Sequence, residues 1–599
     1  MRMLLAVVVG LSVGSLAACV ARAPTDTGGR FKRELADDWQ YWMDQYPELA
    51  TQFGEPGRNG RWTDYSPEAI AAREAYLRAS ADRLASEDRA SLSPADRLDY
   101  DLYRDSIDSA VQGLAFHDDA VPIKGVIPHN LFMPMNQLEG LAQDVPLAIS
   151  LMPFGTTRDY DDLVSRLAAL PALVDQTVAL MEQGMAAGMT PPRVTFRDVP
   201  NQIRAQIVDD PRQSPLLASL NAFPASMSDA DRQRITAAAV GAYETVARPA
   251  FQKLHVFLTT RYLPACRETP GVDGLPDGAA MYAYNVRWHT TTALTPAQIH
   301  QIGLDEVTRI RADMDVVIGQ TGFKGSFAEF ATFLRTDPRF YFTDAASLLA
   351  AYRDVAKRID PQLAHLFGRL PETPYGVVPV PDAIAPSQTT AYYQPGAFAA
   401  GRPGNMYANT YKLESRPRWE MEALTMHEAV PGHHLQISLA QERPDVAAFR
   451  RNASYTAFVE GWALYSESLG GEMGFYTDPY AKFGQLTYDM WRAVRLVVDT
   501  GLHSMGWTRQ EAIDYFAANT PKTIQDITVE VDRYMVWPGQ ALGYKIGQLK
   551  IRELRTRAEQ KLGASFDVRA FHDLVLAEGA IPLDVLERRV DDWIAGVQR

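Results

Sequence analysis

The sequence predicts a mainly α-helical fold of two lobes, with one small β-sheet in the second lobe. The chain has 599 residues, which is more than a single hydrophobic core usually holds. Long segments carry apolar residues at three- and four-residue spacing, with polar faces between them, as amphipathic helices do. Three short segments near residue 400 are instead rich in aromatic and β-branched residues, which favours strands.

Helices are expected from residue 31 to about residue 247, and again from residue 416 to the C-terminus. Thr295 and Pro296 resemble a helix start, with threonine as N-cap and proline at the first helical position. The clearest helical segments of the first half are 66–85, 94–114, 160–187 and 229–263. The expected strands are 375–380, 390–393 and 405–411.

These features divide the chain into four parts. They are a signal peptide (1–18), a tether (19–30), an N-terminal helical region (31–290) and a catalytic region (291–599) that contains the sheet.

The N-terminus resembles a bacterial lipoprotein signal. Arg2 precedes an apolar run too short to span a bilayer comfortably, and the run ends in Leu-Ala-Ala before Cys19. Cys19 is therefore predicted to carry the lipid anchor, with an ordinary secretory signal as the alternative. Val20 favours sorting to the outer membrane, facing the periplasm. Cys266 is the one other cysteine, so an internal disulfide in the mature chain is excluded, and we expect it to be buried.

Composition excludes several classes of function. The net charge is −14 and the pI is near 5.4, so no basic surface for nucleic acid is expected. The sequence has no nucleophile elbow, Walker A or dinucleotide-binding motif.

Three of the eleven histidines lie within residues 427–434. The pair His427-Glu428 is how zinc peptidase helices begin their motif: the imidazole binds zinc, and the carboxylate acts as general base towards water. The usual second ligand at i+4 is replaced by Pro431. His434 at i+7 lies ~10.5 Å further along a regular helix, too far for one ion.

The helix must therefore be interrupted. Pro431 removes a donor and Gly432 relaxes the backbone, so a bulge that absorbs two residues would bring His433 into the i+4 role. His433 is the predicted second ligand, and His434 is held in reserve.

A following helix is expected to supply the third ligand. Its candidates are the carboxylates Glu442, Asp445, Glu460, Glu467 and Glu472. Glu460 is preferred because its neighbours are apolar, where a carboxylate is costly unless a cation satisfies it. Glu467 is seven residues on and is expected to orient an imidazole. The alternative is a Glu460–arginine pair inside a helical core.

Further groups are candidates for catalysis and substrate binding. Asp499 and His503 are spaced i,i+4 on a helix, so the carboxylate can orient the imidazolium. The imidazolium could then stabilise the oxyanion that forms during hydrolysis. The alternative is that the two residues form a structural hydrogen bond. Tyr534 is slightly preferred over Tyr544 as the residue whose phenol stabilises the oxyanion. Arg533 and Tyr544 are predicted to bind substrate.

The strand before the motif helix is a second candidate for substrate binding. Asn405, Tyr407 and Asn409 would bind an extended peptide by strand addition if this strand lies at a sheet edge. The alternative is an interior strand with no free edge.

Three blocks carry a family likeness: HEAVPGHHLQ at 427–436, EGWALY at 460–465 and RYMVWPGQA at 533–541. They resemble the bacterial family catalogued as domain of unknown function 885, over residue 31 to the C-terminus. That family is similar in fold to gluzincin-type metallopeptidases, mostly helical with a small sheet beside a deep cleft. The resemblance implies zinc bound by His427, one histidine of the 433–434 pair and Glu460, with Glu428 as base.

The expected function is zinc-dependent hydrolysis of peptide bonds in the cell envelope. The alternatives are zinc-dependent hydrolysis of another amide or ester, and a lipoprotein that binds peptides without turnover. Only the two hydrolase hypotheses require Glu428, because a general base does not contribute to the affinity of a protein that merely binds peptides.

Overall fold

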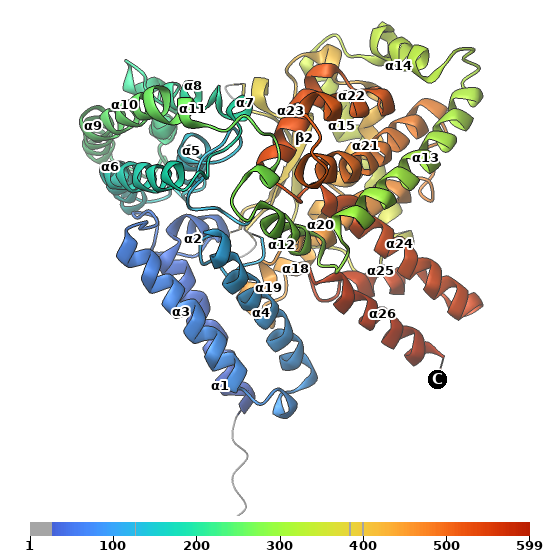
Figure 1. The fold of residues 1–599 in the computed structure, drawn as a ribbon, viewed down its shortest axis with the longest axis horizontal. Coiled ribbons are helices and arrows are strands. Elements are labelled where there is room, and N and C mark those ends of the chain that lie inside the picture. The colour runs from blue at the N-terminus through green and yellow to red at the C-terminus, as the bar shows by residue number, and fades with distance from the viewer. Residues whose placement is uncertain (1–26, 126, 383–384, 398–400, 599) are drawn as a thin grey trace, which may run out of the picture.

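The computed structural model describes residues 27–125, 127–382, 385–397 and 401–598. Helices dominate these residues and a three-stranded sheet completes them, so the predicted mainly α fold is confirmed. Figure 1 shows the helices α1–α11 gathered on one side of the molecule and α12–α26 on the other, with the sheet between them.

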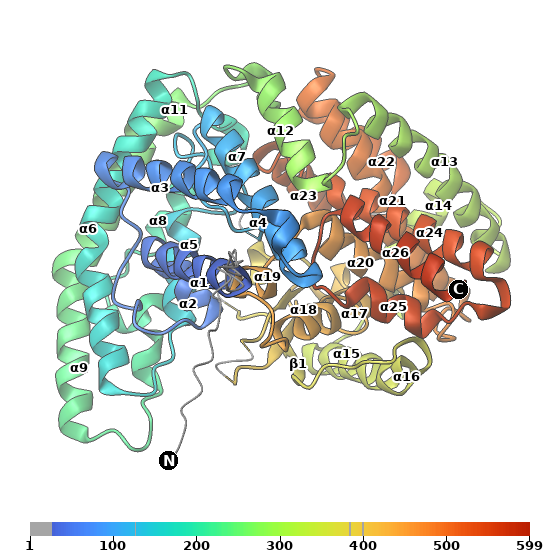
Figure 2. The same ribbon diagram turned by 90° about the horizontal axis from the view of Figure 1, so that it is seen from below.

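The N-terminal helices form two groups, which Figure 2 shows from below. The first group is α1 (Thr27–Gln45), α2 (Pro47–Phe53), α3 (Pro67–Ser86) and α4 (Pro94–Gly113). The second is α5 (Leu141–Ser150), α6 (Thr157–Ala186), α7 (Arg193–Phe196), α8 (Val199–Arg204), α9 (Asp229–Ala242), α10 (Arg248–Phe257) and α11 (Leu263–Ala265). Two π-helical turns, Tyr243–Ala247 and Leu258–Tyr262, join α9, α10 and α11 into the continuous helix predicted over 229–263.

The helix α6 is long and apolar enough, by length and composition, to cross a membrane. Its apolar face lies in a core shared with α9 and α10, through Leu163, Leu167, Leu170 and Met181. A helix buried in the core of a folded protein can have the same length and apolar composition. Cys266 is buried beside this core, as predicted, and burial raises the pKa of its thiol to about 12.

The remaining helices surround the sheet. Before it come α12 (Gly278–Thr290), α13 (Pro296–Gln320), α14 (Phe327–Thr336), α15 (Ala345–Ile359) and α16 (Leu363–Leu366). After it come α17 (Met421–Glu428), α18 (His433–Gln441), α19 (Ala448–Arg451), α20 (Thr456–Leu469), α21 (Pro479–Ser504), α22 (Arg509–Asn519), α23 (Ile524–Val536), α24 (Leu542–Leu562), α25 (Val568–Leu576) and α26 (Leu583–Val597). Thr295 caps α13 through a capping box, as the sequence predicts.

The sheet has the order β1-β3-β2. Its strands are β1 (Tyr375–Pro379), β2 (Ala391–Gln394) and β3 (Gly404–Ala408). β1 pairs with β3 in parallel, and β2 pairs with β3 antiparallel with Tyr393 opposite Met406. The three strands match the three predicted segments, and β3 is the central strand.

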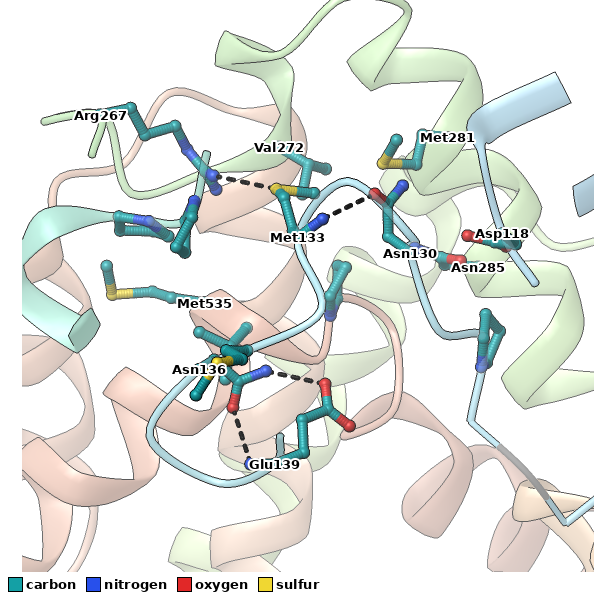
Figure 3. A pocket seen from close by; sticks show the side chains of 16 residues that line it. Asp118, Asn130, Met133, Asn136, Glu139, Arg267, Val272, Met281, Asn285 and Met535 are labelled. Atoms are coloured by element: carbon teal, nitrogen blue, oxygen red, sulfur yellow. Dashed lines mark hydrogen bonds between the residues drawn. The ribbon is translucent and has the colours of Figure 1, made fainter. Parts of the chain in front are cut away.

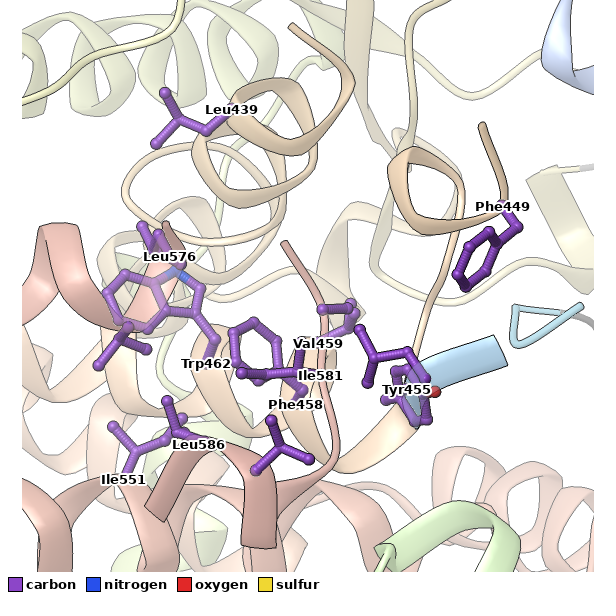
Figure 4. Close-up of a cluster of buried hydrophobic side chains, with 14 of the residues drawn as sticks. Leu439, Phe449, Tyr455, Phe458, Val459, Trp462, Ile551, Leu576, Ile581 and Leu586 are labelled. Carbon is purple, nitrogen blue, oxygen red and sulfur yellow. The ribbon is translucent and has the colours of Figure 1, made fainter. Parts of the chain in front are cut away.

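A large apolar core fixes helix α20, which carries the candidate ligand Glu460. Val459 and Trp462 flank that residue, and Figure 4 shows them among the side chains of α18, α24, α25 and α26. Trp462 is fully buried and donates its indole N–H to the carbonyl of Pro431, at 2.8 Å. The core thus ties α20 to the turn between the two histidine-bearing helices.

The predicted signal peptide 1–18 and Cys19 lie outside the described residues. The predicted tether, residues 19–30, extends too far towards the C-terminus, because α1 already begins at Thr27. Its apolar face buries Phe31 and Leu35, which extends helix formation towards the N-terminus.

Candidate metal centre

The motif chain folds as two helices joined by a turn. α17 ends at Glu428 and α18 begins at His433, with a cis Val430–Pro431 bond between them. The predicted interruption of the helix at Pro431 is therefore confirmed, but it is a complete break between two helices rather than a bulge that absorbs two residues. A Cβ on Gly432 would lie 2.0 Å from the carbonyl oxygen of His427, so only glycine permits this close return of the backbone.

The turn brings together His427, His433 and Glu460, and one ligand atom from each lies within 4.8 Å of the others. His427 Nε2 is 3.5 Å and His433 Nε2 is 3.4 Å from the same oxygen, Glu460 Oε2. That oxygen is buried and has no hydrogen-bond partner among the described residues. A buried carboxylate oxygen without a donor is costly unless a cation satisfies it.

The distances from the two imidazole nitrogens to Glu460 fit the spacing of zinc ligands. Zinc binds imidazole nitrogen and carboxylate oxygen at about 2.0–2.2 Å in tetrahedral geometry, so neighbouring ligand atoms lie about 3.3–3.5 Å apart. Both distances to Glu460 fall in this range. The three donors are also of the type that zinc prefers.

Glu467 orients the ring of His427, as predicted. Its Oε1 is 2.8 Å from His427 Nδ1, which leaves Nε2 directed towards Glu460. Glu467 is fully buried, and Arg492 approaches the same oxygen at 3.4 Å. Arg492 is a member of this site that was not predicted from the sequence.

The acids around His427 control its protonation. Burial lowers the pKa of this imidazole, but the neighbouring carboxylates of Glu460 and Glu467 outweigh burial and raise the pKa to about 9. Burial raises the pKa of Glu460, and the two imidazoles reverse this and hold it well below its usual range. A proton and a metal ion therefore compete for the same nitrogen.

Glu428 follows His427 in sequence but is not one of the three clustered groups. Its side chain is largely buried, with 9% of the residue exposed. Burial raises the pKa of its carboxyl, and the nearby imidazoles oppose that shift. A carboxylate with a raised pKa beside the candidate ligands suits a general base.

His434 lies outside the cluster. Its Nε2 is 3.1 Å from the carbonyl of Thr373, and its Nδ1 is 2.9 Å from the hydroxyl of Tyr393. Both ring nitrogens are thus engaged, and burial lowers the pKa of the ring to about 4. Of the two alternatives held open for the second ligand, the structure brings His433 and not His434 to Glu460.

Two of the other candidate carboxylates are used elsewhere. Glu442 accepts hydrogen bonds from the backbone N–H groups of Glu372 and Thr373, and Glu472 pairs with Arg555 at 2.7 Å. Asp445 is exposed on the surface.

Asp499 and His503 do not bond to each other, so the prediction that Asp499 orients a catalytic His503 is corrected. Asp499 accepts from the hydroxyl of Tyr282 at 2.6 Å and from the Gly539 N–H at 3.1 Å. His503 accepts at Nδ1 from the Val272 N–H and contacts the Tyr534 carbonyl through Nε2. Both side chains are fully buried and hold three segments together, so their role is structural.

Tyr534 is also committed to a structural network. Its hydroxyl accepts from Arg495 and donates to Glu530, at 2.9 and 2.8 Å, and the residue is 1% exposed. Tyr544 is the phenol beside the cluster, because its ring lies parallel to that of His427 with centroids 6.4 Å apart. The slight preference for Tyr534 is therefore corrected to Tyr544.

The predicted strand addition to Asn405, Tyr407 and Asn409 is wrong. These residues belong to or follow β3, and both edges of β3 are occupied. Asn409 is fully buried and its amide donates to three backbone carbonyls. Tyr407 stacks on Tyr392.

β2 is the strand nearest the cluster. Tyr393 bonds to His434, and its ring lies parallel to the ring of His433 with centroids 6.5 Å apart. No described strand pairs with the outer edge of β2.

A separate cavity of about 70 Å³ lies between the N-terminal helices and α12 and α23 (Figure 3). None of the clustered residues lines it. Four methionines and several polar groups do: Asp118, Asn130, Met133, Met135, Asn136, Glu139, Arg267, Met281, Asn285 and Met535.

Asp118 in this cavity gives a pH-dependent prediction. Burial and the nearby Asp119 raise the pKa of Asp118 to about 8. The folded state then binds more protons than the unfolded state between the usual pKa and about 8, so stability falls as pH rises through that window. Asp118→Asn is expected to raise the unfolding free energy by on the order of 2 kcal/mol at pH 8 and to change it little at pH 4. Denaturant titration at both pH values measures this.

The exposed Asp592→Asn is the control and should show no such difference. Equal effects of Asp118→Asn at both pH values would contradict the assignment.

The fold and site define a mainly helical protein in which two histidines and a glutamate are grouped as candidate metal ligands. The chain belongs to the family described as "Bacterial protein of unknown function (DUF885)", whose sequence profile matches residues 47–590. The predicted family is thus confirmed, while the gluzincin relation stays a prediction. A comparison with curated proteins finds no match.

Two solved structures share the fold. One is described as "The crystal structure of the putative lipoprotein from Colwellia psychrerythraea", with a TM-score of 0.88 and 29% identity, covering 95% of this chain and 99% of that chain. The other, from Shewanella oneidensis, is described as "a putative lipoprotein of unknown function", with a TM-score of 0.69 and 17% identity, covering 94% and 98%.

Proposed function

We propose that the protein is a zinc-dependent peptidase. The observation that carries the proposal is the approach of His427 Nε2 and His433 Nε2 to one unpartnered oxygen of Glu460 at zinc-ligand spacing. Glu428 adjoins this cluster without belonging to it. Ligands and base thus occupy the separate positions that hydrolysis requires.

Zinc bound here would polarise the scissile carbonyl and lower the pKa of a water molecule. Glu428 takes the proton from water as the oxygen bonds to the carbonyl carbon. The same carboxyl then delivers the proton to the amine nitrogen as the C–N bond breaks. Tyr544, whose ring lies parallel to that of His427, is the phenol that we propose as donor to the developing oxyanion.

The outer edge of β2 is the proposed position for the substrate backbone. An extended chain can add to a strand whose N–H and C=O groups are unpaired. β2 contacts the histidine pair through Tyr393, so a peptide along this edge passes close to the cluster.

We place the protein in the bacterial cell envelope, anchored by lipid at Cys19 on the periplasmic face of the outer membrane. The lipoprotein-like signal supports this, as does the description of the Colwellia psychrerythraea protein.

Metal content tests the proposal. The chain without residues 1–19 is expected to hold about one zinc, measured by mass spectrometry after dialysis. His427→Ala should lose the ion, because it removes one of three ligands. His434→Gln is the matched control: it alters the neighbouring buried histidine, which bonds to Thr373 and Tyr393, and should keep the zinc.

A mixed peptide library then tests turnover by the zinc-loaded chain. Zinc without cleavage would shift the proposal to a non-peptide amide or ester. Absence of metal from the wild-type chain, even after zinc is supplied, would overturn it and favour a binding protein.

A further inference from the structure

Three arginines are buried on one side of the candidate centre. Arg492 and Arg495 lie on α21 and Arg533 lies on α23, with side chains that are 6%, 4% and 17% exposed. They surround the ring of Tyr544: the guanidinium carbon of Arg495 is 4.3 Å from the ring centroid, and that of Arg492 is 5.8 Å away. Arg533 donates to the Tyr544 hydroxyl at 3.1 Å.

Among the residues that the structure describes, two carboxylates pair with these three guanidinium groups. Glu467 lies 3.4 Å from Arg492, while Glu530 lies 2.9 Å from Arg495 and 3.7 Å from Arg533. The guanidinium groups thus outnumber the carboxylates that pair with them. A buried charge without a counter-ion is expensive, so an anion that joins the group is strongly favoured.

The group also has donors without acceptors. Arg495 Nη1, Arg533 Nε and the indole Nε1 of Trp537 are buried and have no hydrogen-bond partner among the described residues. Arg533 lies over the Trp537 ring, 5.3 Å from its centroid. Each unsatisfied buried donor destabilises the folded protein, and a carboxylate can accept from several donors at once.

The position of the group relative to His427 fixes its role. Arg492 Nη2 lies 3.5 Å from His427 Nδ1, and the Tyr544 ring lies parallel to the His427 ring with centroids 6.4 Å apart, so the group adjoins the candidate centre. Arg533 is the most exposed of the three arginines and is therefore the one that an incoming ligand meets first.

We infer that Arg533, Arg495 and Trp537 form a site for a carboxylate of the substrate, next to the bond that is cut. The inference rests on the proposed function and narrows its substrate class. A terminal α-carboxylate in this site makes the enzyme a carboxypeptidase. An acidic side chain in the site makes it specific for Asp or Glu near the cut.

Matched peptides separate these two sources of carboxylate. One sequence is prepared as the free acid, as the C-terminal amide, and as the amide with Glu replacing the last residue. The zinc-loaded protein is expected to cleave a carboxylate-bearing peptide with kcat/KM at least tenfold above the neutral amide. Preference for the free acid identifies the α-carboxylate, and preference for the Glu amide identifies the side chain.

Arg533→Met tests the residue. It should raise KM for the carboxylate peptide at least tenfold, reduce the preference over the neutral amide to about twofold, and leave the zinc content unchanged. Arg533→Lys retains the charge without the planar fork and should restore part of the preference. Equal turnover of all three peptides by the wild-type protein would overturn the inference.

Binding distinguishes failure of this inference from failure of the proposed function. Calorimetry with the zinc-loaded Glu428→Gln protein should show tighter binding of the preferred carboxylate peptide than of the amide, by at least tenfold. That result would support the carboxylate site even if no peptide is cleaved. Equal affinities would overturn the site and leave the peptidase proposal standing if cleavage is observed.

Discussion

Glu428→Gln is expected to lower kcat about 10³-fold while the protein keeps its zinc. Glutamine preserves the shape of the side chain but cannot take a proton from water, and loss of a general base costs about 10²–10⁴-fold. The side chain is not among the three clustered ligand groups, so metal binding should be unchanged. Single-turnover cleavage of the best library peptide, with zinc content measured on the same sample, gives both quantities.

Glu422→Gln is the matched control for this experiment. Glu422 lies on the same helix, and burial likewise raises the pKa of its carboxyl. Glu422 does not contact the histidine cluster, so the activity of the Glu422→Gln protein should stay within about twofold of wild type. If Glu428→Gln retained full activity, Glu428 would not be the base and the proposed mechanism would fail.

Local sequence patterns predict much of this fold because amphipathic periodicity and capping act over a few residues. The capping box at Thr295, the helix over 229–263 and all three strands follow from such short-range signals. The preference for Glu460 followed from the cost of a carboxylate among apolar neighbours. The structure brings that residue to His427 and His433.

The errors concern contacts between segments distant in sequence. Strand order depends on pairings that a single strand does not encode, so the sequence left open whether β3 lies at an edge, and the structure shows the interior alternative. The i,i+4 spacing of Asp499 and His503 suggested a pair, but their partners come from Tyr282, Val272, Tyr534 and Gly539. The arginine group combines residues of α21 and α23. Its one local signal is two arginines among the apolar residues of α21.

Gly461→Ala is expected to lower the unfolding free energy by about 3 kcal/mol and zinc affinity by at least tenfold. α20 and α24 cross where Gly461 meets Gly547, and a Cβ on Gly461 would lie 2.5 Å from the backbone carbonyl carbon of Gly547. Backbone atoms cannot rotate away as a flexible side chain can, so the helices must separate. α20 carries Glu460 and Glu467, so its displacement moves one candidate ligand and the group that orients His427.

Gly596→Ala provides a control of opposite sign. A Cβ at this position in α26 meets nothing within 4 Å, so the substitution should stabilise the helix by up to about 1 kcal/mol through propensity alone. Denaturant titration and a zinc competition assay with a chromophoric chelator measure both effects. If Gly461→Ala matched wild type in both assays, the α20–α24 crossing would tolerate expansion. The position of Glu460 would then be set by the apolar core around Trp462 rather than by the contact of the two glycines.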